Sequence, residues 1–375
     1  MVFVIRVDSS FDIGSGHVMR CMVLAENLKQ KLSQVYFICR EHRGSLIEYI
    51  ESRGYKVFRL PNNNSVKTHI NSEDEITNWL GDSQEEDALE CLKITQKLKP
   101  DWLIVDHYFI DKQWELILKR NNLQLMVIDD LANREHECEV LLDQNYYISP
   151  HDRYSNLISD KCHNLLGPQF ALLRKEFINC ALSESQKNDS KFHIFIFMGS
   201  SDKDNQTLKA INSVISLLEK GVLLSVDVLV GSININAIEI ENLCNKHSEI
   251  TFFKSTNKIS KLMSKANISI GAGGFSSIER CYLGLPSLVI SLATNQIETT
   301  NALDSLGAIC HLGWHESVDE EIIATEIKKA MNSPDQLKKM TLKALSIFHS
   351  NNGYIEIGGE YIANLMLKKS IVHKE

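Results

Sequence analysis

One local pattern repeats along most of the chain: a short apolar segment rich in β-branched residues, then a polar turn, then a segment with helical periodicity. Residues 1–7 followed by 18–32 are the first copy, and residues 35–39 followed by 46–53 are the second. Strands that alternate with helices pair in parallel, because each helix returns the chain to the edge at which the previous strand began. The pattern therefore predicts an α/β protein with doubly wound, Rossmann-like sheets.

The pattern stops at a polar segment, residues 182–191, and restarts at residues 192–198. The chain has 375 residues, and a single hydrophobic core stops growing at about 250–300 residues. We therefore expect an N-terminal Rossmann-like domain at 1–185, a C-terminal one at 190–350, and a helix and tail at 351–375 that packs back on the first domain. The polar excursion at residues 61–86 has no assigned role.

Charge and composition exclude several classes of partner. The net charge is −8 and the isoelectric point is about 5.9, which argues against a nucleic-acid or anionic-membrane surface. No apolar stretch is long enough to span a bilayer and the N-terminal residues lack a secretory pattern, so we expect a cytoplasmic protein without a membrane partner. The nine cysteines include no Cys-x-x-Cys pair, so we expect buried thiols and no metal site. We also expect a monomer, since no apolar surface stripe stands out.

The first candidate site follows the first predicted strand. Its residues are Arg6-x-Asp8-Ser9-Ser10-x-x-Ile13-Gly14-x-Gly16-His17-x-x-Arg20. Gly14 and Gly16 permit close approach of a phosphorylated ligand, although the spacing fails the dinucleotide fingerprint, so we expect no cofactor. The dipole at a helix start favours a neutral imidazole, which makes His17 either a catalytic base or a simple helix cap. Asp8 and Arg20 either bind substrate or form an ion pair that holds the loop.

The second candidate site follows the predicted strand at 268–271. It is the turn Gly271-Ala-Gly273-Gly274-Phe-Ser276-Ser277-Ile-Glu279, in which backbone amides and two serine hydroxyls could cradle a diphosphate. Glu279 is either a partner for ribose hydroxyls or a favourable charge near a helix N-terminus. Asn295 and Gln296 follow the next predicted strand, and we expect them to face the same ligand.

Further positions are candidates for substrate binding. Gly199 and Ser200 follow the strand at 192–198, where they form either a ligand turn or an ordinary turn and helix cap. Asp106 and His107 end a buried strand, and they either line a sugar pocket or simply terminate the strand. Arg174 lies shortly before the polar linker and can reach a phosphate or a sugar.

Together these residues resemble the UDP-2,4-diacetamido-2,4,6-trideoxy-β-L-altropyranose hydrolases of bacterial pseudaminic acid biosynthesis. The matching segments occur in the family's order and lie at residues 6–20, 104–108, 129–130, 170–177, 198–199 and 295–299. The resemblance implies a glycosyltransferase-B-like arrangement of the two domains, with the nucleotide-sugar in an interdomain cleft. It also implies that His17 is the catalytic base and that Arg174, Glu279 and Asn295 contact the nucleotide-sugar.

The reaction implied by this resemblance is hydrolysis of a UDP-linked diacetamido sugar. Water attacks the anomeric carbon with inversion, UDP leaves, and free 2,4-diacetamido-2,4,6-trideoxy-L-altrose is released without a metal ion. Two alternatives stay open from the residues alone. The chain could be a UDP-sugar glycosyltransferase that passes the sugar to an acceptor, or a non-catalytic nucleotide-sugar sensor.

Overall fold

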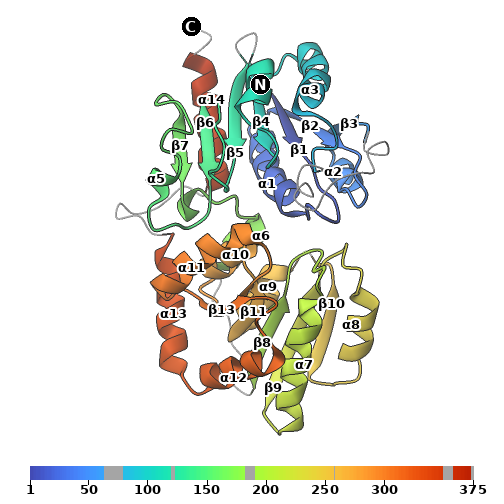
Figure 1. Ribbon diagram of the computed structural model, residues 1–375, viewed down its shortest axis with the longest axis vertical. Helices are drawn as coiled ribbons and strands as arrows, with labels where there is room; N and C mark the ends of the chain where they lie inside the picture. The colour runs from blue at the N-terminus through green and yellow to red at the C-terminus, as the bar shows by residue number, and fades with distance from the viewer. Residues whose placement is uncertain (63–78, 120–122, 182–190, 257, 349–357, 373–375) are drawn as a thin grey trace. The chain divides into compact units, whose positions relative to one another are not determined.

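The computed structural model describes residues 1–62, 79–119, 123–181, 191–256, 258–348 and 358–372, which form two compact α/β units (Figure 1). The first unit comprises Met1–Gln144 and Ser149–Leu172 with the C-terminal helix; the second comprises Asn145–Ile148 and the chain from Leu173 up to that helix. The boundary predicted near residue 185 and residues 63–78 of the polar excursion lie outside the described residues. The predicted α/β fold with two domains is confirmed.

The first unit is built on a parallel sheet of seven strands in the order β3-β2-β1-β4-β5-β6-β7. The strands are β1 (Val2–Val7), β2 (Gln34–Arg40), β3 (Lys56–Leu60), β4 (Trp102–Asp106), β5 (Gln124–Ile128), β6 (Val140–Asp143) and β7 (His163–Leu166). The helices of this unit are α1 (Gly16–Gln30), α2 (Ile47–Ser52), α3 (Gln84–Leu98), α4 (Lys112–Leu118), α5 (Pro150–Arg153) and α14 (Gly358–Val372), with a 3₁₀ turn η3 (Pro168–Phe170).

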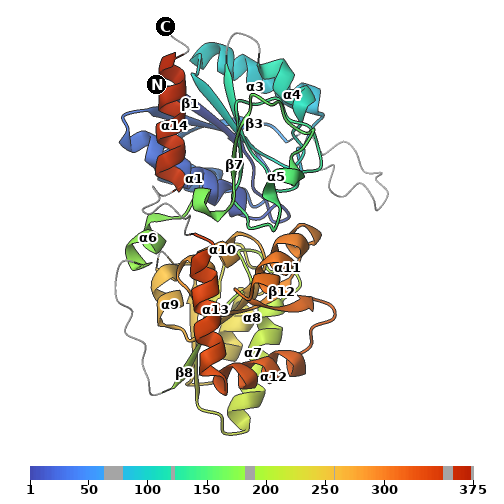
Figure 2. The same cartoon turned by 90° about the vertical axis from the view of Figure 1, so that its left-hand side faces the viewer.

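Helices cover both faces of this sheet, because successive side chains of a strand point to opposite faces. In β1, Phe3 and Ile5 pack in one core cluster with residues of α1 and α14, whereas Val4 packs in another with residues of α3 and α4. Helix α14 lies beside α1 (Figure 2). The indole N–H of Trp102 donates to Ser370 Oγ at 2.8 Å, so a polar bond also ties α14 to the sheet.

The second unit has a parallel sheet of six strands in the order β10-β9-β8-β11-β12-β13. The strands are β8 (Phe192–Phe197), β9 (Leu224–Val230), β10 (Ile250–Lys254), β11 (Ile268–Ala272), β12 (Ser287–Ser291) and β13 (Cys310–Trp314). The helices are α6 (Lys175–Ala181), α7 (Gln206–Glu219), α8 (Ala237–Cys244), α9 (Ile259–Lys265), α10 (Phe275–Tyr282), α11 (Ile297–Leu306), α12 (Glu320–Met331) and α13 (Pro334–Ser346), with a 3₁₀ turn η4 (Thr294–Gln296).

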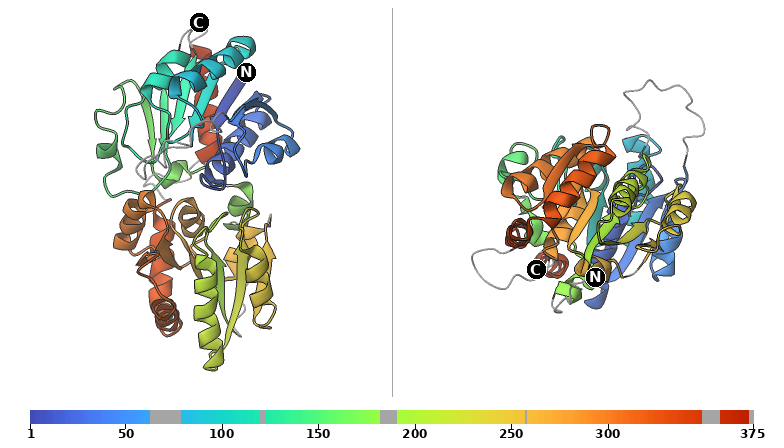
Figure 3. Two further views of the ribbon diagram at one scale, coloured as in Figure 1. Left: turned by 45° about the vertical axis from the view of Figure 1, so that its right-hand side comes forward. Right: turned by 90° about the horizontal axis from the view of Figure 1, so that it is seen from below.

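Helices α7, α8 and α12 pack together on one face of the second sheet, where α7 is the yellow-green helix of Figure 3. Helices α6 and α9 pack on the other face, and α10, α11 and α13 share a further cluster around Val289 of β12. Among the described helices of both units, none is long and apolar enough to cross a membrane.

Each sheet has one point at which the strand order reverses, and there the turns that leave two neighbouring strands lie side by side. In the first unit the reversal lies between β1 and β4, where Val7 is paired with Asp106. In the second it lies between β8 and β11, where Phe197 is paired with Gly271. The three glycine-containing loops that the sequence singled out, after β1, β8 and β11, therefore all begin at such a reversal.

Candidate active site

The loop after β1 brings His17 against the last residue of β4. The imidazole Nδ1 lies 2.6 Å from Oδ1 of Asp106. Because a carboxylate can only accept, Nδ1 carries the proton in this bond, and the lone pair of Nε2 is left to accept another proton. Among the described residues none hydrogen-bonds Nε2. The pair therefore has the arrangement of a general base oriented by a carboxylate.

Arg20 fixes the carboxylate that orients His17. Its Nε and Nη2 donate to the two oxygens of Asp106, each at 2.6 Å, and its Nη1 donates to Asp130 at 2.9 Å. Burial alone would raise the pKa of Asp106, but Arg20 and His17 lower it well below its ordinary range. Asp106 is thus a stable carboxylate. Arg20 therefore forms an ion pair, but with Asp106 and Asp130 and not with Asp8, so the Asp8–Arg20 pair offered by the sequence is not formed. For Asp106, the geometry indicates a support for His17 more than a wall of a sugar pocket.

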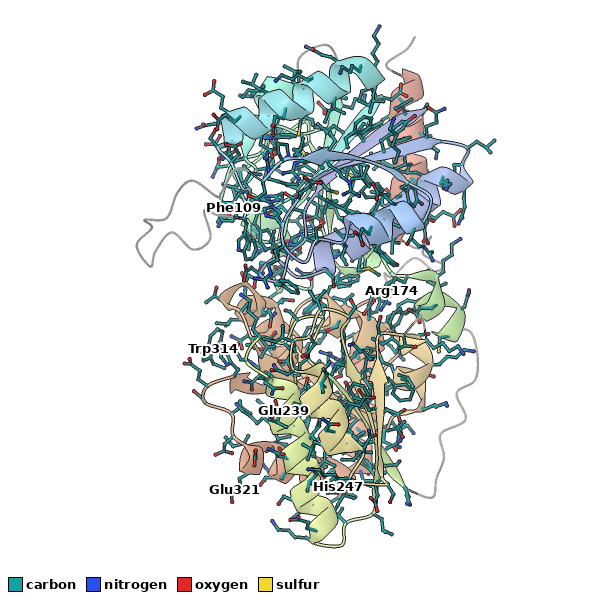
Figure 4. All side chains as sticks on the ribbon, turned by 90° about the vertical axis from the view of Figure 1, so that its right-hand side faces the viewer. Phe109, Arg174, Glu239, His247, Trp314 and Glu321 are labelled. Carbon is teal, nitrogen blue, oxygen red and sulfur yellow. The ribbon has the colours of Figure 1, made fainter. Side chains whose placement is uncertain are left out.

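Aromatic rings flank His17. The ring of Tyr108 meets the imidazole edge to face with centroids 4.6 Å apart, and Trp79 stacks on Tyr108 at 6.0 Å. Burial raises the pKa of Tyr108, so its hydroxyl stays protonated at neutral pH. Phe109, labelled in Figure 4, packs against Trp79 with centroids 6.1 Å apart. Trp79 was not singled out from the sequence, because it lies in the polar excursion, where no periodicity marks a packed side chain.

Asp8 and His107 belong to a separate buried cluster. Asp8 Oδ1 accepts from the backbone N–H of Arg40 at 2.7 Å and lies 2.6 Å from Nη1 of Arg6. Nε2 of His107 lies 3.5 Å from Oδ2 of Asp8, and Nε2 of His42 lies 3.7 Å from it. Burial lowers the pKa of His107 to about 4, so this imidazole is neutral. Of the two alternatives for Asp8, this geometry favours the structural one.

Gly14 and Gly16 shape the start of α1. Gly14 has φ +78°, a left-handed conformation that costs glycine little, and its N–H donates to the carbonyl of Ser10 at 2.9 Å. A Cβ added to Gly16 would meet nothing within 4 Å. The N-cap residue Ser15 makes no side-chain bond to α1, so within the described part of the chain the first amides, next to His17, are available to an anion.

The turn between β11 and α10 also leaves a helix start uncapped. Gly274 precedes α10 with φ +83° and without a side-chain cap. A Cβ added to Gly273 would lie 2.8 Å from Thr300 Oγ1 and 3.0 Å from Gln296, so only glycine fits there. Gln296 packs over the turn and accepts from the N–H of Leu292 at 3.0 Å, while Asn295 beside it is exposed. These residues form the glycine-turn site, which comprises residues 271–280 with Asn295 and Gln296.

The two serines of this turn differ in what they can still bind. Ser277 is buried, accepts from Arg280 Nη2 at 2.8 Å and donates to the carbonyl of Ala272 at 3.4 Å. Ser276 is half-buried and accepts from Arg280 Nη1 at 3.3 Å. Its hydroxyl proton has no acceptor among the described residues, so Ser276 is the serine that can donate to a ligand.

Arg174 and Glu279, which are distant in the sequence, meet in the second unit. Arg174 immediately precedes α6 (Figure 4), and its Nε and Nη2 both donate to Oε1 of Glu279, at 3.0 and 2.9 Å. Its Nη1 lies 2.9 Å from Oε1 of Glu176. Burial raises the pKa of Glu279, and the charge of Arg174 opposes this shift. Oε2 of Glu279 has no partner among the described residues and can accept from a ligand.

Hydrogen bonds of the neighbouring Asp202 stabilise the turn that holds Gly199 and Ser200. Asp202 accepts from the N–H groups of Gln206 and Thr207, both at 2.9 Å, and so caps α7. A Cβ added to Gly231 would lie 2.2 Å from the carbonyl oxygen of Ser200, so the turn also packs tightly on a neighbouring loop. The geometry favours the ordinary turn and helix cap at Gly199 and Ser200.

Within the described residues, no group of three or more His, Cys, Asp or Glu side chains could hold a metal ion.

Parts of the chain are similar to known proteins. Residues 176–352 match the glycosyltransferase family 28 C-terminal domain, and this range includes the whole turn between β11 and α10. The chain is 29% identical over 308 residues to the UDP-2,4-diacetamido-2,4,6-trideoxy-beta-L-altropyranose hydrolase of Campylobacter jejuni, which covers 82% of this chain and 97% of that relative.

Solved structures share the fold at low sequence identity. The spinosyn forosaminyltransferase SpnP has a TM-score of 0.66 with 11% identity, over 99% of both chains. Acinetobacter baumannii MurG has a TM-score of 0.63 with 13% identity, over 98% of this chain and 99% of that one. These likenesses show that the chain shares its two-domain α/β fold with these proteins.

Proposed function

We propose that this chain, which is 29% identical to a UDP-2,4-diacetamido-2,4,6-trideoxy-beta-L-altropyranose hydrolase, hydrolyses the same UDP-linked diacetamido sugar to UDP and free 2,4-diacetamido-2,4,6-trideoxy-L-altrose. The single observation that carries the proposal is the bond between His17 and Asp106, 2.6 Å long, at the reversal of the first sheet. It supports a base that can take a proton from water, which hydrolysis requires and simple binding does not.

In this mechanism, water attacks the anomeric carbon from the face opposite UDP. As the new C–O bond forms, Nε2 of His17 takes a proton from the water, and Asp106 stabilises the imidazolium that results. The bond between the anomeric carbon and the phosphate oxygen breaks, and its electron pair leaves with UDP. The anomeric centre is inverted, because attack and departure occur on opposite faces.

The glycine-turn site is proposed to hold UDP. The uncapped amides of α10 and the hydroxyl of Ser276 are donors for the diphosphate, and they stabilise the charge that UDP gains on leaving. These groups supply the stabilisation that a metal ion gives in other enzymes, so the proposed reaction needs no metal. Oε2 of Glu279 is proposed to accept from ribose hydroxyls, with Arg174 holding the carboxylate in place.

Release of UDP from the diacetamido sugar nucleotide, in EDTA and without an acceptor, tests the function. We expect turnover by the chain alone, with one UDP and one free sugar per substrate. UDP release only after an acceptor is added would indicate a glycosyltransferase, and binding without any release would indicate a sensor. Either result would replace the hydrolase proposal.

A Glu279→Gln variant tests the nucleoside end of the site. The amide keeps an oxygen for Arg174 but removes the charged acceptor, so we expect UDP binding to weaken about tenfold or more, the usual cost of a hydrogen bond to a charged group. Binding of 2′-deoxy-UDP should change less, because this ligand lacks one ribose donor. Isothermal titration calorimetry measures both affinities. Glu176→Gln is the matched control, since Glu176 also contacts Arg174. If Glu279→Gln bound UDP with the affinity of wild type, the ribose contact would be excluded.

A further inference from the structure

Arg280 is a fully buried arginine beneath the turn between β11 and α10, with an exposed fraction of 0%. Among the described residues, no carboxylate oxygen lies within 4.0 Å of its nitrogens. Burial of a charged guanidinium without an ion-pair partner is costly even after the surroundings relax. The same burial lowers the pKa of Arg280 to about 10, so the side chain is still charged at neutral pH. The neighbouring Glu279 interacts with this charge electrostatically, but from beyond ion-pair distance. A buried charge without a carboxylate in direct contact points to a further anion, supplied by a ligand.

The guanidinium is aimed at the turn. Nη2 donates to the carbonyl of Ala272 at 2.7 Å and to Ser277 Oγ at 2.8 Å, while Nη1 donates to Ser276 Oγ at 3.3 Å. A Cβ added to Gly271 would lie 2.5 Å from Nη1, so glycine at 271 is what lets the arginine pass under the strand end. Nε has no partner. The direct partners of the guanidinium are thus neutral oxygens, of Ala272, Ser276 and Ser277, and none of them is a carboxylate.

Ser276 connects this charge to the surface of the turn. Its oxygen accepts from Arg280, so its own proton must point to another acceptor, and none is present among the described residues. A hydroxyl whose oxygen accepts from a cation is a stronger donor than a free one, because hydrogen bonds in a chain polarise each other. Ser277 cannot take this role, since its proton goes to the carbonyl of Ala272.

We infer that Arg280 is a positioning residue for diphosphate binding: it supplies the buried positive charge of the site and acts on the diphosphate through the hydroxyl of Ser276. The inference rests on the proposed function for the identity of the ligand, a nucleoside diphosphate. Arg280 itself does not touch the ligand. Its effect is expected on the phosphate groups and not on the nucleoside.

Calorimetric affinities for UDP and for uridine test this role. We expect Arg280→Met to weaken UDP binding at least tenfold while the affinity for uridine changes less than twofold. Arg280→Lys, which keeps the charge, should recover most of the UDP affinity. Ser276→Ala should also weaken UDP binding, whereas the matched Ser277→Ala should have little effect. The double variant Arg280→Met with Ser276→Ala should bind UDP no more weakly than Arg280→Met alone. Both changes remove the same hydrogen-bonded connection between the buried charge and the diphosphate.

Several results would overturn the inference. They are wild-type UDP affinity in Arg280→Met, an equal loss for uridine and UDP, and equal effects of Ser276→Ala and Ser277→Ala. If Arg280 only held the shape of the turn, UDP and uridine would lose affinity equally. The Arg280→Lys variant would then not recover binding. If Arg280→Met does not fold, Ser276→Ala decides alone. Because these measurements follow binding, UDP binding without hydrolysis would contradict the proposed hydrolase and leave this inference intact.

Discussion

Replacement of His17 by alanine is expected to lower kcat for release of UDP from the sugar nucleotide by roughly 10²–10⁴-fold, the usual contribution of a general base. The side chain is only 8% exposed, and the cavity left by its removal adjoins Asp106 and Tyr108. Water alone would then have to lose its proton without a positioned acceptor. UDP affinity should stay near that of wild type, because the proposed UDP donors lie in the second unit.

The measurement is a single-turnover rate of UDP release, together with calorimetric binding of UDP to the same preparation. His163→Ala is the matched control, since His163 is an exposed histidine of the same unit. Retention of the wild-type rate by folded His17→Ala would remove His17 as the base. A loss of UDP affinity that equals the loss of rate would instead assign His17 to ground-state binding.

Asp106→Asn is expected to impair both activity and stability. The amide can donate as well as accept, so it no longer specifies that Nδ1 of His17 carries the proton, and it leaves Arg20 without its buried carboxylate. In a comparable carboxylate–histidine pair the change from Asp to Asn costs about 10⁴-fold in kcat. Loss of one partner from a buried ion pair typically costs about 3–5 kcal/mol in the free energy of unfolding.

The matched control is Asp130→Asn. Asp130 meets Arg20 only at Nη1, also interacts with Tyr108, and is partly exposed, so its replacement should cost less in both measurements. Urea unfolding gives the stability, and the rate of UDP release gives the activity. Wild-type kcat in folded Asp106→Asn would contradict the orienting role, and equal effects of the two variants would show that Arg20 alone is being perturbed.

The stability effect of Asp106 should depend on pH. Its pKa in the folded chain lies well below its ordinary value, so the carboxylate stabilises the fold at every pH above the unfolded pKa of about 3.9. The difference in unfolding free energy between wild type and Asp106→Asn should therefore stay constant from about pH 8 to pH 5. It should shrink as the pH falls below about 4, where the unfolded state takes up a proton that the folded state does not.

Local sequence patterns predicted most of the elements that position the sites. The apolar runs at residues 102–106 and 192–198 match β4 and β8 closely, and both glycine loops were located because turn chemistry is local. Strands β6, β7 and β13 were not predicted. They are short, and the exposed His163 and Asn164 of β7 give it little apolar signal. Their place in the sheets comes from pairing with neighbours, which no local pattern encodes.

The sequence by itself determined the fold class, the two turns and the candidate base, because periodicity, glycine placement and helix starts are properties of a few consecutive residues. Only the tertiary structure decided what those residues do. His17 and Asp106 are 89 positions apart, and Arg174 and Glu279 are 105 apart. Their contacts depend on strand order and register, such as the pairing of Val7 with Asp106. The burial of Arg280, with no described carboxylate within ion-pair distance, is likewise visible only once packing has excluded water from its side chain.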